Sequence, residues 1–463
     1  MKNTVKSMKK KKDWQTRAVK RKHKEQDKGI LGLMFIMNHF FRHLTEWIEE
    51  MEDPRNVSYI TYSQSDYIYL GILKNLCGVK TMHSMEEQFN EDACIRTLGI
   101  LSGNTDAVEI PHSDSLNNYL KKLSPDCLAE LRKKMIKNLL RMKTFYGNRL
   151  MGKYWRIIID GTSLYYFKEK HCDNCLVTTR IMKNGKSVKI YSHKVLEAKL
   201  ILSSKIVLSI DTEFIENESE NAGKQDCESN AAKRLLTRLK RDYPRLPICI
   251  QADNLYETEP IIKLCKQYDF RYLVTHKGSR QKLLEESYRL FVENKEAGTA
   301  DKICEEKGKA VYVNHIEHTV EKEYDANIFE YSYSEKKANG EIKETKFQWI
   351  TDIELNAKNL EEMIDAGRGR WKIENEGFNN QKNGIYEIEH LNSRNATAMK
   401  NHYLLTQIAD IIMQLYLAWN PMRKAVGLSI KNTSSMLLES FRRLQITDED
   451  VSYCSRYTTV YLE

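Results

Sequence analysis

The stretch KYWRIIIDGT, residues 153–162, is the point at which helical patterning gives way to strand-like patterning. Its run of β-branched and other apolar residues is typical of a central strand, and the run ends in Asp160-Gly161. An aspartate in that position is commonly a turn residue or a helix cap. Open α/β sheets, however, place their active sites at the carboxyl ends of strands. The role of Asp160 therefore depends on which other residues reach that edge of the sheet.

The residues after this stretch alternate between strand-like and helix-like runs. The strand-like runs occupy 193–204, 205–215, 246–254 and 270–277, and the helix-like runs occupy 224–243 and 257–268. With the opening run counted as the first strand, the order is three strands, helix, strand, helix and strand, which predicts an α/β domain. The fourth strand ends in Asp253, which places a second carboxylate at the same predicted edge as Asp160.

A different pattern begins after residue 278. The runs KAVYVNHIEHTV, NIFEYSYS and TKFQWITDI alternate between polar and apolar residues, and Asn339-Gly340 is a hairpin-turn dipeptide. We therefore expect an all-β insertion over residues 279–352, which is well beyond ordinary loop lengths.

Amphipathic helical patterns fill residues 30–150, and a largely helical tail fills 395–463. The Lys- and Arg-rich faces of the first region would suit DNA, although a solvated helix face has the same composition. The longest apolar run, IADIIMQLYLAW (408–419), is too short and too interrupted to span a bilayer. We expect it to form a buried helix.

The net charge of +9 is located at the N-terminus. Residues 1–30 carry twelve lysines and arginines against three acidic residues, so the rest of the chain is neutral on balance. A basic, apolar-poor tail over residues 1–29 is disordered by default and suits a polyanion, because each neutralised phosphate releases counterions. Its densest run is Lys9, Lys10, Lys11 and Lys12. A merely solubilising tail is the alternative.

The ten cysteines are scattered, which favours a reduced, intracellular setting. Cys172 and Cys175 form the one tight pair, in HCDNCL (171–176). With His193 they supply three of the four ligands that a structural zinc ion needs, and His171 would be a strained fourth because it adjoins Cys172. A loop with free thiols is the alternative.

The stretch GRGRWKIENEGFNNQK, residues 367–382, has helical spacing and supplies a third acid. Arg370 lies one turn before Glu374, so Glu374 is either half of an exposed ion pair or a metal ligand with an arginine beside it. Glu376 is the rival acid, but it lies about 200° from Glu374 around a helix, so the two cannot serve one site. Carboxylates at Asp160, Asp253 and Glu374 can hold two Mg²⁺ ions, which clamp the attacking and leaving oxygens of a phosphoryl displacement.

With these residues the chain resembles the DDE transposases of bacterial insertion sequences, in the group whose RNase H-like catalytic domain is interrupted by a β-rich insertion domain. The resemblance covers roughly residues 80–420. Its carriers are IIIDGT, IQADNLYE and GRGRWKIENEGFNNQK, with KQDCESNAAKRLL and AMKNHYLLTQIADII as further support. It implies that Asp160, Asp253 and Glu374 are the catalytic, metal-binding acids, with Mg²⁺, or Mn²⁺ in its place, as the cofactor.

The family's signature on the last helix is Tyr-x2-Arg-x3-Glu-x6-Lys, and this chain departs from it twice. Gly367 stands at the tyrosine position and Gln381 at the lysine position, with Lys382 one residue later. On a helix of about 100° per residue, the residue seven after Glu374 lies nearly beneath it, and the next one is turned away. We therefore expect Arg370 to face DNA, and Lys382 to reach DNA only through its long stem.

Several aromatic and apolar residues complete the expected site. Trp371, Ile373 and Phe378 are expected to hold the helix of Glu374 against the sheet. Trp349 either stacks on an extruded base, as the insertion tryptophans of some relatives do, or belongs to the core. Tyr256 is expected to pack near the metal site.

The function that the resemblance implies is cut-and-paste DNA transposition: cleavage at terminal inverted repeats, then attack of the freed 3′-hydroxyl on target DNA. It also implies a homodimer in the working complex. The expected location is the cytoplasm, in association with the nucleoid, and no membrane partner is expected. An RNase H-like nuclease without strand transfer and a domesticated, inactive DNA-binding protein are the alternatives. The expected units are a basic tail (1–29), a helical DNA-binding region (30–150), the first part of the catalytic domain (151–278), the insertion (279–352), the second part of the catalytic domain (353–394) and a helical C-terminal region (395–463).

Overall fold

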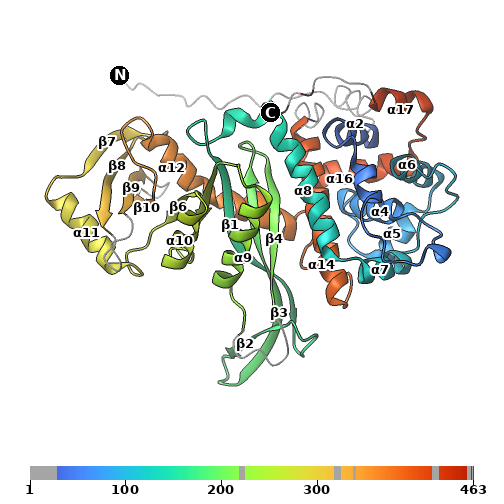
Figure 1. Cartoon of the computed structure of the whole chain (residues 1–463), viewed down its shortest axis with the longest axis horizontal. Coiled ribbons are helices and arrows are strands. Elements are labelled where there is room, and N and C mark those ends of the chain that lie inside the picture. Colours follow the sequence, from blue (N-terminus) through green and yellow to red (C-terminus); the bar gives the residue numbers. More distant parts are fainter. Residues whose placement is uncertain are drawn as a thin grey trace.

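In the computed structural model, strands β1–β6 of a large sheet lie between a helical region at one end and the insertion, which adds further strands to the sheet, at the other (Figure 1). It describes residues 29–217, 225–317, 325–336, 340–419, 427–455, 460 and 462, without the side chains of residues 325, 375 and 376. The basic tail, with Lys9, Lys10, Lys11 and Lys12, lies outside the described residues. Within the described part, no helix has both the length and the apolar character needed to cross a membrane.

A ten-stranded mixed sheet is the centre of the fold, which confirms the mixed α/β class. The strands follow the order β2-β3-β1-β5-β6-β10-β9-β8-β7, and β4 pairs with β3 off this path. Their bounds are β1 Trp155–Phe167, β2 Leu176–Ile181, β3 Ser187–Ile201, β4 Val207–Ile215, β5 Ile248–Ala252, β6 Arg271–Thr275, β7 Gly298–Ile303, β8 Gly308–Glu317, β9 Asp325–Lys336 and β10 Ile342–Thr351.

Strand β1 is a central strand, as its sequence predicts. Ile157, Ile158 and Ile159 are each 0% exposed, so both faces of the strand are covered. β1 pairs in parallel with β5 and antiparallel with β3. The prediction that the strand ends at Asp160 is wrong: β1 continues to Phe167, because β3 stays paired with it along that stretch.

The hairpin of β2 and β3 projects from the sheet (Figure 1). The sequence pattern does not predict β2, because four of its six residues are exposed and it lacks an apolar run. The loop between β1 and β2 carries Cys172 and Cys175, and the neighbouring strand β3 carries His193.

Two helices connect the strands that carry the aspartates. They are α9 Glu228–Asp242, between β4 and β5, and α10 Glu259–Gln267, between β5 and β6. In α9 the buried side chains Ala231, Leu235 and Leu239 recur every four residues, so the helix presents one apolar stripe to the sheet. Both helices are confirmed where the sequence predicts them.

The insertion extends the main sheet through β10, which pairs with β6 at Trp349↔Thr275 and two further positions. Strands β9 and β10 form the predicted antiparallel hairpin; Gly340 has a φ of 87°, while Asn339 lies outside the described residues. The expectation of an all-β insertion is wrong, because α11 Lys282–Glu293 precedes β7. Its buried residues Leu284 and Tyr288 lie one turn apart, a helical spacing that the period-two pattern farther along did not predict.

The N- and C-terminal helices pack as one bundle around α14, which contacts α2, α4, α7 and α8. The run at 408–419 lies in α14 and is largely buried, as expected. The helices are α2 Ile30–Phe40, α3 Leu44–Glu49, α4 Gln64–Leu76, α5 Met82–Phe89, α6 Asp92–Ser102, α7 Ser113–Lys122, α8 Pro125–Arg141, α14 Ala396–Trp419, α16 Ile430–Arg443 and α17 Asp448–Cys454, with 3₁₀ turns η1 Val57–Tyr59 and η2 Lys143–Asn148.

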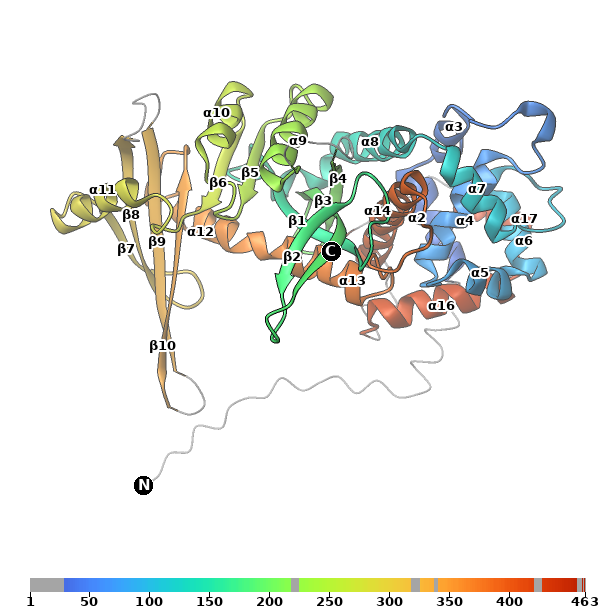
Figure 2. The same ribbon diagram turned by 90° about the horizontal axis from the view of Figure 1, so that it is seen from below.

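A continuous helical run joins the insertion to this bundle across the sheet (Figure 2). It consists of α12 Leu360–Arg368, the 3₁₀ turn η3 Gly369–Trp371, the π-helical segment η4 Ile373–Asn379 and α13 Asn380–Asn383. Glu374 therefore lies on a π-helical segment and not on the regular α-helix that the sequence predicts. π-Helical turns are rare and are found frequently at functional sites.

Candidate active site

The pairing of β1 with β5 places Asp160 and Asp253 level with each other. The parallel register ends at Ile158↔Gln251, and each aspartate follows two residues later: Asp160 within β1, and Asp253 directly after the last residue of β5. Because side chains alternate along a strand, residues two apart point to the same face. The two aspartates thus lie at the same edge, where β5 ends and β1 continues with β3.

Each aspartate is held by a backbone amide. The amide N–H of Gly161 donates to Oδ1 of Asp160 at 2.9 Å, and that of Leu255 donates to Oδ1 of Asp253 at 2.8 Å. Asp253 therefore does form the turn that a strand-end aspartate commonly forms. In each bond Oδ1 is the acceptor, and the hydrogen bond orients the carboxylate.

The helical run brings Glu374 and Arg370 to the same place. Nη1 of Arg370 lies 3.5 Å from Oδ2 of Asp160, so the arginine pairs with the first aspartate. Ile373 and Phe378 are buried against the sheet, as expected, at 0% and 6% exposure. Trp371 is 47% exposed, so its expected packing role is wrong. The side chain of Glu376 lies outside the described residues.

The electrostatics of Asp160 report the proximity of the acids. Burial raises the pKa of Asp160 to about 6; Arg370 opposes this shift, and the carboxylates of Asp253 and Glu374 add to it. Glu374 itself is exposed. We call Asp160, Asp253 and Glu374 the acid site: its negative charges destabilise one another unless a cation lies between them.

Glu228 is a fourth carboxylate at this place, and the sequence reasoning missed it. It is the first residue of α9, and a Cβ added to Gly161 would lie 2.7 Å from its Cδ. The hydroxyl of Tyr256, which is 1% exposed, donates to Oε2 of Glu228 at 3.3 Å. An acid in the first turn of a helix is ordinarily a partner of the helix dipole, so the sequence alone gave no reason to single it out.

Tyr256 packs beside the acids, as predicted. The pKa of its phenol is raised by burial and then by three carboxylates, those of Glu228, Asp160 and Asp253. Its ring is buried, and its hydroxyl donates to Glu228.

The donor set fits magnesium in its chemistry, because carboxylate oxygens are the ligands that Mg²⁺ prefers. The acids are not yet gathered for ligation, however. In the described part of the chain, the ligand atoms of His171, Cys172, Cys175 and His193 all lie within 4.8 Å of one another. The carboxylates of the acid site do not form such a close group. Arg370, in contact with Asp160, supplies the positive charge of the acid site in this arrangement.

Both departures from the family signature have a structural reason. A Cβ at Gly367 would lie 2.5 Å from Cε2 of Trp349, so a larger residue would collide with the indole. Gln381 is 0% exposed and donates from Nε2 to Asp410 at 2.9 Å, inside a buried polar cluster with Lys199 and Gln407.

The π-helical segment also changes the angular position of Lys382 around the helix. A π turn contains one residue more than an α turn, so the residue eight positions after Glu374 takes the angular place that the seventh has in an α-helix. The one-residue delay therefore does not by itself turn Lys382 away. Its Nζ pairs with Glu389 at 2.9 Å.

A pocket of about 460 Å³ adjoins the acid site on the insertion side. Its lining is basic and aromatic, and includes Lys277, Lys346, Arg368, Arg370 and Trp371. Of the two roles left open for Trp349, the buried position favours the core: this residue is 2% exposed and packs against Phe329 and Phe347, with part of its indole bordering the pocket. Trp371, at 47% exposure, is the most exposed of the aromatic residues that line this pocket.

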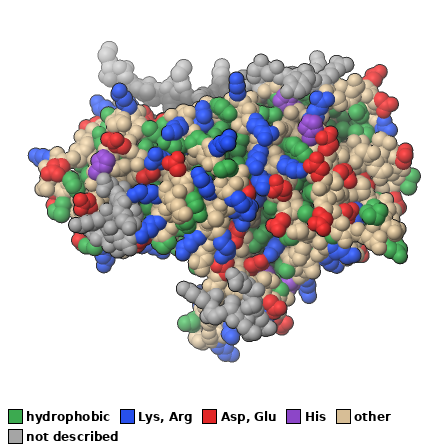
Figure 3. All heavy atoms as spheres, in the orientation of Figure 1, with side chains coloured by type: hydrophobic (Ala, Val, Ile, Leu, Met, Phe, Trp, Pro, Cys, Tyr) green, Lys and Arg blue, Asp and Glu red, His purple; other side chains and the backbone are tan. Residues whose placement is uncertain are grey.

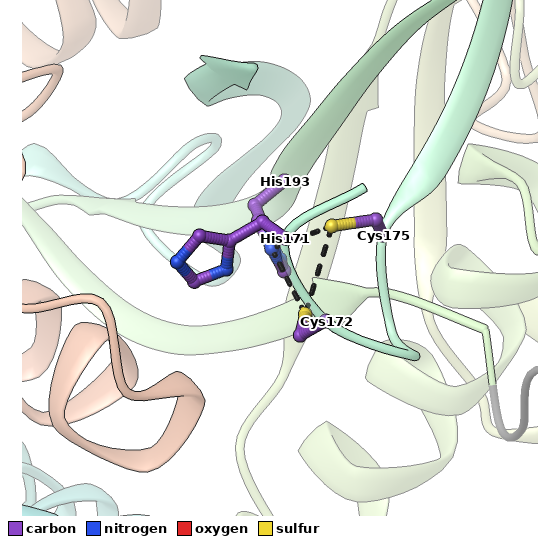
Figure 4. A group of neighbouring side chains, drawn as sticks. All are labelled: His171, Cys172, Cys175 and His193. Carbon is purple, nitrogen blue, oxygen red and sulfur yellow. Dashed lines mark hydrogen bonds between the residues drawn. The ribbon is translucent and has the colours of Figure 1, made fainter. Parts of the chain in front are cut away.

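A second ligand set lies at the base of the β2–β3 hairpin (Figure 4), and we call it the Cys–His cluster: His171, Cys172, Cys175 and His193. The Sγ atoms of Cys172 and Cys175 are 3.6 Å apart, and each lies 3.4 Å from Nε2 of His193. Burial lowers the pKa of His193 to about 4, with His171 and Lys400 contributing, so its imidazole is neutral near pH 7.

Comparisons with known proteins add a distant likeness. No family model matches the chain, and no curated protein matches it. Among solved structures it is similar to a piggyBac transposase in a synaptic complex with hairpin DNA, determined by cryo-electron microscopy, with a TM-score of 0.39 and 11% identity over 92% of this chain and 86% of that chain.

Proposed function

We propose that this protein is a DDE transposase that cleaves DNA at transposon ends and joins the freed ends to target DNA. The observation that carries the proposal is the level placement of Asp160 and Asp253 at the point where β1 and β5 part, with Glu374 acting on Asp160 from a third element. This supports the RNase H-like architecture and the acid triad that the sequence motifs imply.

The protein's own residues would act as follows. Asp160, Asp253 and Glu374 would hold divalent cations, with the hydrogen bonds from Gly161 and Leu255 orienting the two aspartates. Bound Mg²⁺ supplies charge neutralisation at the scissile phosphate and a more acidic attacking hydroxyl group. Arg370 would exchange its contact with Asp160 for the DNA phosphate, to which its guanidinium can donate in a bidentate manner.

Glu228 would complete the acid site as a positioning residue. Its carboxylate lies against Gly161, directly after Asp160, and accepts from Tyr256. A carboxylate fixed there orders the backbone beside Asp160 and adds negative charge that favours a cation.

The pocket beside Arg370 would receive the DNA end. Lys277, Lys346 and Arg368 offer phosphate contacts, and the exposed Trp371 offers a surface on which a base can stack. Trp371 thus takes the role that the sequence suggested for Trp349. Lys382 is a further candidate for a backbone contact, once its pair with Glu389 opens.

A broader basic surface would carry the duplex. Lysine and arginine side chains gather over the middle of one face (Figure 3), where α8 and α9 lie in Figure 1. α9 begins at the acid site with Glu228, which connects this surface to the chemistry. The helical region 30–150 would recognise terminal inverted repeats, the basic tail would add affinity, and two chains would pair the two ends.

The test supplies the purified chain and Mg²⁺ with DNA carrying the inverted repeats that flank its gene. Cut ends, followed by products joined to a second duplex, are expected. Cleavage without joining would assign the RNase H-like nuclease alternative, and specific binding without cleavage would assign the inactive DNA-binding alternative.

A further inference from the structure

We propose that the Cys–His cluster is a structural zinc site in which Cys172, Cys175 and His193 bind the ion and His171 completes the tetrahedron. The distances match the ion. Zinc with bonds of about 2.3 Å to sulfur and about 2.0–2.1 Å to nitrogen separates two sulfurs by about 3.8 Å and sulfur from nitrogen by about 3.6 Å. The observed separations are 3.6 Å and 3.4 Å.

The placement of the ligands also distinguishes this site from a disulfide or a loop with free thiols. A disulfide needs a sulfur–sulfur distance of about 2.05 Å, and both cysteines are free. The two thiols and the imidazole, of which Cys175 and His193 are buried and Cys172 is half-buried, would otherwise exchange only weak sulfur hydrogen bonds. On metal binding the two thiols lose their protons to solvent and become thiolate ligands.

His171 is the fourth ligand by its position and its unmet need. Its ring stacks on Phe167 with centroids 4.5 Å apart and is turned to one side of the other three residues (Figure 4). Its buried Nδ1 has no hydrogen-bond partner among the residues that the structure describes. A rotation of this side chain would bring a ring nitrogen to the ion and satisfy that atom.

The zinc site would fix the start of α9 as well as the hairpin. Nδ2 of Asn217 donates to the carbonyl of Cys175 at 3.0 Å, and Nε2 of Gln225 donates to the carbonyl of Val177 at 3.1 Å. Gln225 lies three residues before Glu228. The loop that carries the cysteines is therefore bonded to the segment that leads into the acid site, although the ion itself takes no part in the proposed DNA chemistry.

The first experiment measures zinc in the full chain, purified under reducing conditions, by elemental mass spectrometry. We expect about one zinc per chain in the wild type, and at least a tenfold loss in Cys172→Ser, Cys175→Ser and His193→Ala. Cys304→Ser is the matched control, because this half-buried cysteine lies in the insertion and should leave zinc unchanged. His171→Ala should retain zinc with weaker affinity in competition with a chelator.

Replacement of zinc by Co²⁺ checks the ligand set, since tetrahedral thiolate coordination gives intense visible absorption that Cys175→Ser should abolish.

Hydrogen exchange then tests the link to α9: removal of zinc should speed exchange at residues 172–178 and 225–230 and leave β5 and β6 unchanged. A wild-type chain that neither contains nor takes up zinc, or one with a Cys172–Cys175 disulfide, would overturn the site. Zinc loss without faster exchange at 225–230 would overturn the link. Asp160→Asn should retain zinc, so failure of this proposal is separate from failure of the transposase proposal.

Discussion

The acid site and the Cys–His cluster are two ligand sets on neighbouring parts of one sheet, and they differ in how completely they are assembled. The cluster draws its residues from one loop and the adjacent strand, and three of its ligand atoms are already within 3.6 Å of each other. The acid site draws on β1, β5 and η4, with Arg370 in contact with Asp160. A structural metal site is closed and buried, whereas a catalytic one must keep room for substrate. Under the two proposals, the part of the chain that the structure describes would hold one set of each kind.

The comparison is tested most strongly by replacing the acids with amides. Asp160→Asn, Asp253→Asn and Glu374→Gln each remove a ligand charge and keep the shape, so cleavage should fall roughly a hundredfold to a thousandfold. DNA binding and zinc content should persist. Cleavage is measured with labelled transposon ends. Glu376→Gln is the control and should stay active; if it were inactive while Glu374→Gln cleaved normally, the third acid would be Glu376.

Glu228→Gln tests whether Glu228 binds the metal ions itself or only positions the residues that do. Groups that orient ligands typically contribute about 10–100-fold to metal affinity or activity, so we expect a loss within that range and a higher Mg²⁺ requirement. The Mg²⁺ dependence of cleavage separates this from an unfolding effect, because excess Mg²⁺ should restore part of the rate. A loss as complete as that of Asp160→Asn, without any response to Mg²⁺, would make Glu228 a catalytic acid.

Gly367→Ala tests how tightly the run that carries Glu374 is packed. The new methyl group would overlap the Trp349 indole, and overpacking of this kind costs about 1–3 kcal/mol. Chemical denaturation should show a lower midpoint. Gly369→Ala is the matched control, because its Cβ would meet only Nη1 of Arg156 at 3.8 Å. Equal effects of the two substitutions would mean that helix propensity and not the indole sets the requirement at Gly367.

Trp371→Ala tests the pocket beside the acid site. Stacking of a base on an aromatic residue is worth about 1–3 kcal/mol, so affinity for single-stranded DNA ends should fall while stability holds. Fluorescence anisotropy gives the affinity and a thermal melt the stability. Tyr453→Ala, at a 58% exposed aromatic residue on α17, should leave binding unchanged. An unchanged affinity in Trp371→Ala would remove base stacking from the proposed DNA contact.

The smallest effect is expected from deleting residues 2–28. Their charge carries no base-reading motif, so the loss should weaken binding to every duplex alike and flatten its salt dependence. Titrations at several salt concentrations measure the slope. Loss confined to the transposon ends would instead give the tail a role in recognition.

The sequence predicts the acid site better than its surroundings. Asp160 and Asp253 follow apolar runs whose strand character is local, and Glu374 has Arg370 one turn earlier, so the sequence with its resemblance names all three as candidates, and their catalytic role stays a prediction. Glu228 could not, because an acid at the start of a helix has an ordinary explanation in the helix dipole. The link between Gly367 and Trp349 joins residues from two elements, and no local pattern records it.

The remaining differences come from pairing across the chain. β1 extends past Asp160 because β3 accompanies it, and β2 forms because β3 offers an edge, although its own residues are mostly exposed. Trp349, whose role was left open, is buried because it lies on a strand inside the sheet. Trp371, which was expected to pack against the sheet, is exposed because it lies on a 3₁₀ turn at the surface. Hydrophobic periodicity describes one segment at a time, so it does not predict the pairing of segments that are distant in the sequence.

The π-helical segment at Ile373–Asn379 is a place where the helical run can hold one additional residue. A helix that gains one residue within a turn can keep its ends in place by widening that turn, so the insertion is absorbed locally and the residues beyond it keep their partners. If the chain descends from the family that its motifs resemble, one such inserted residue would account for Lys382 standing one position late in the motif. Deleting one residue from the segment would then restore the α-helical spacing, and it would show whether the protein's activity depends on the widened turn.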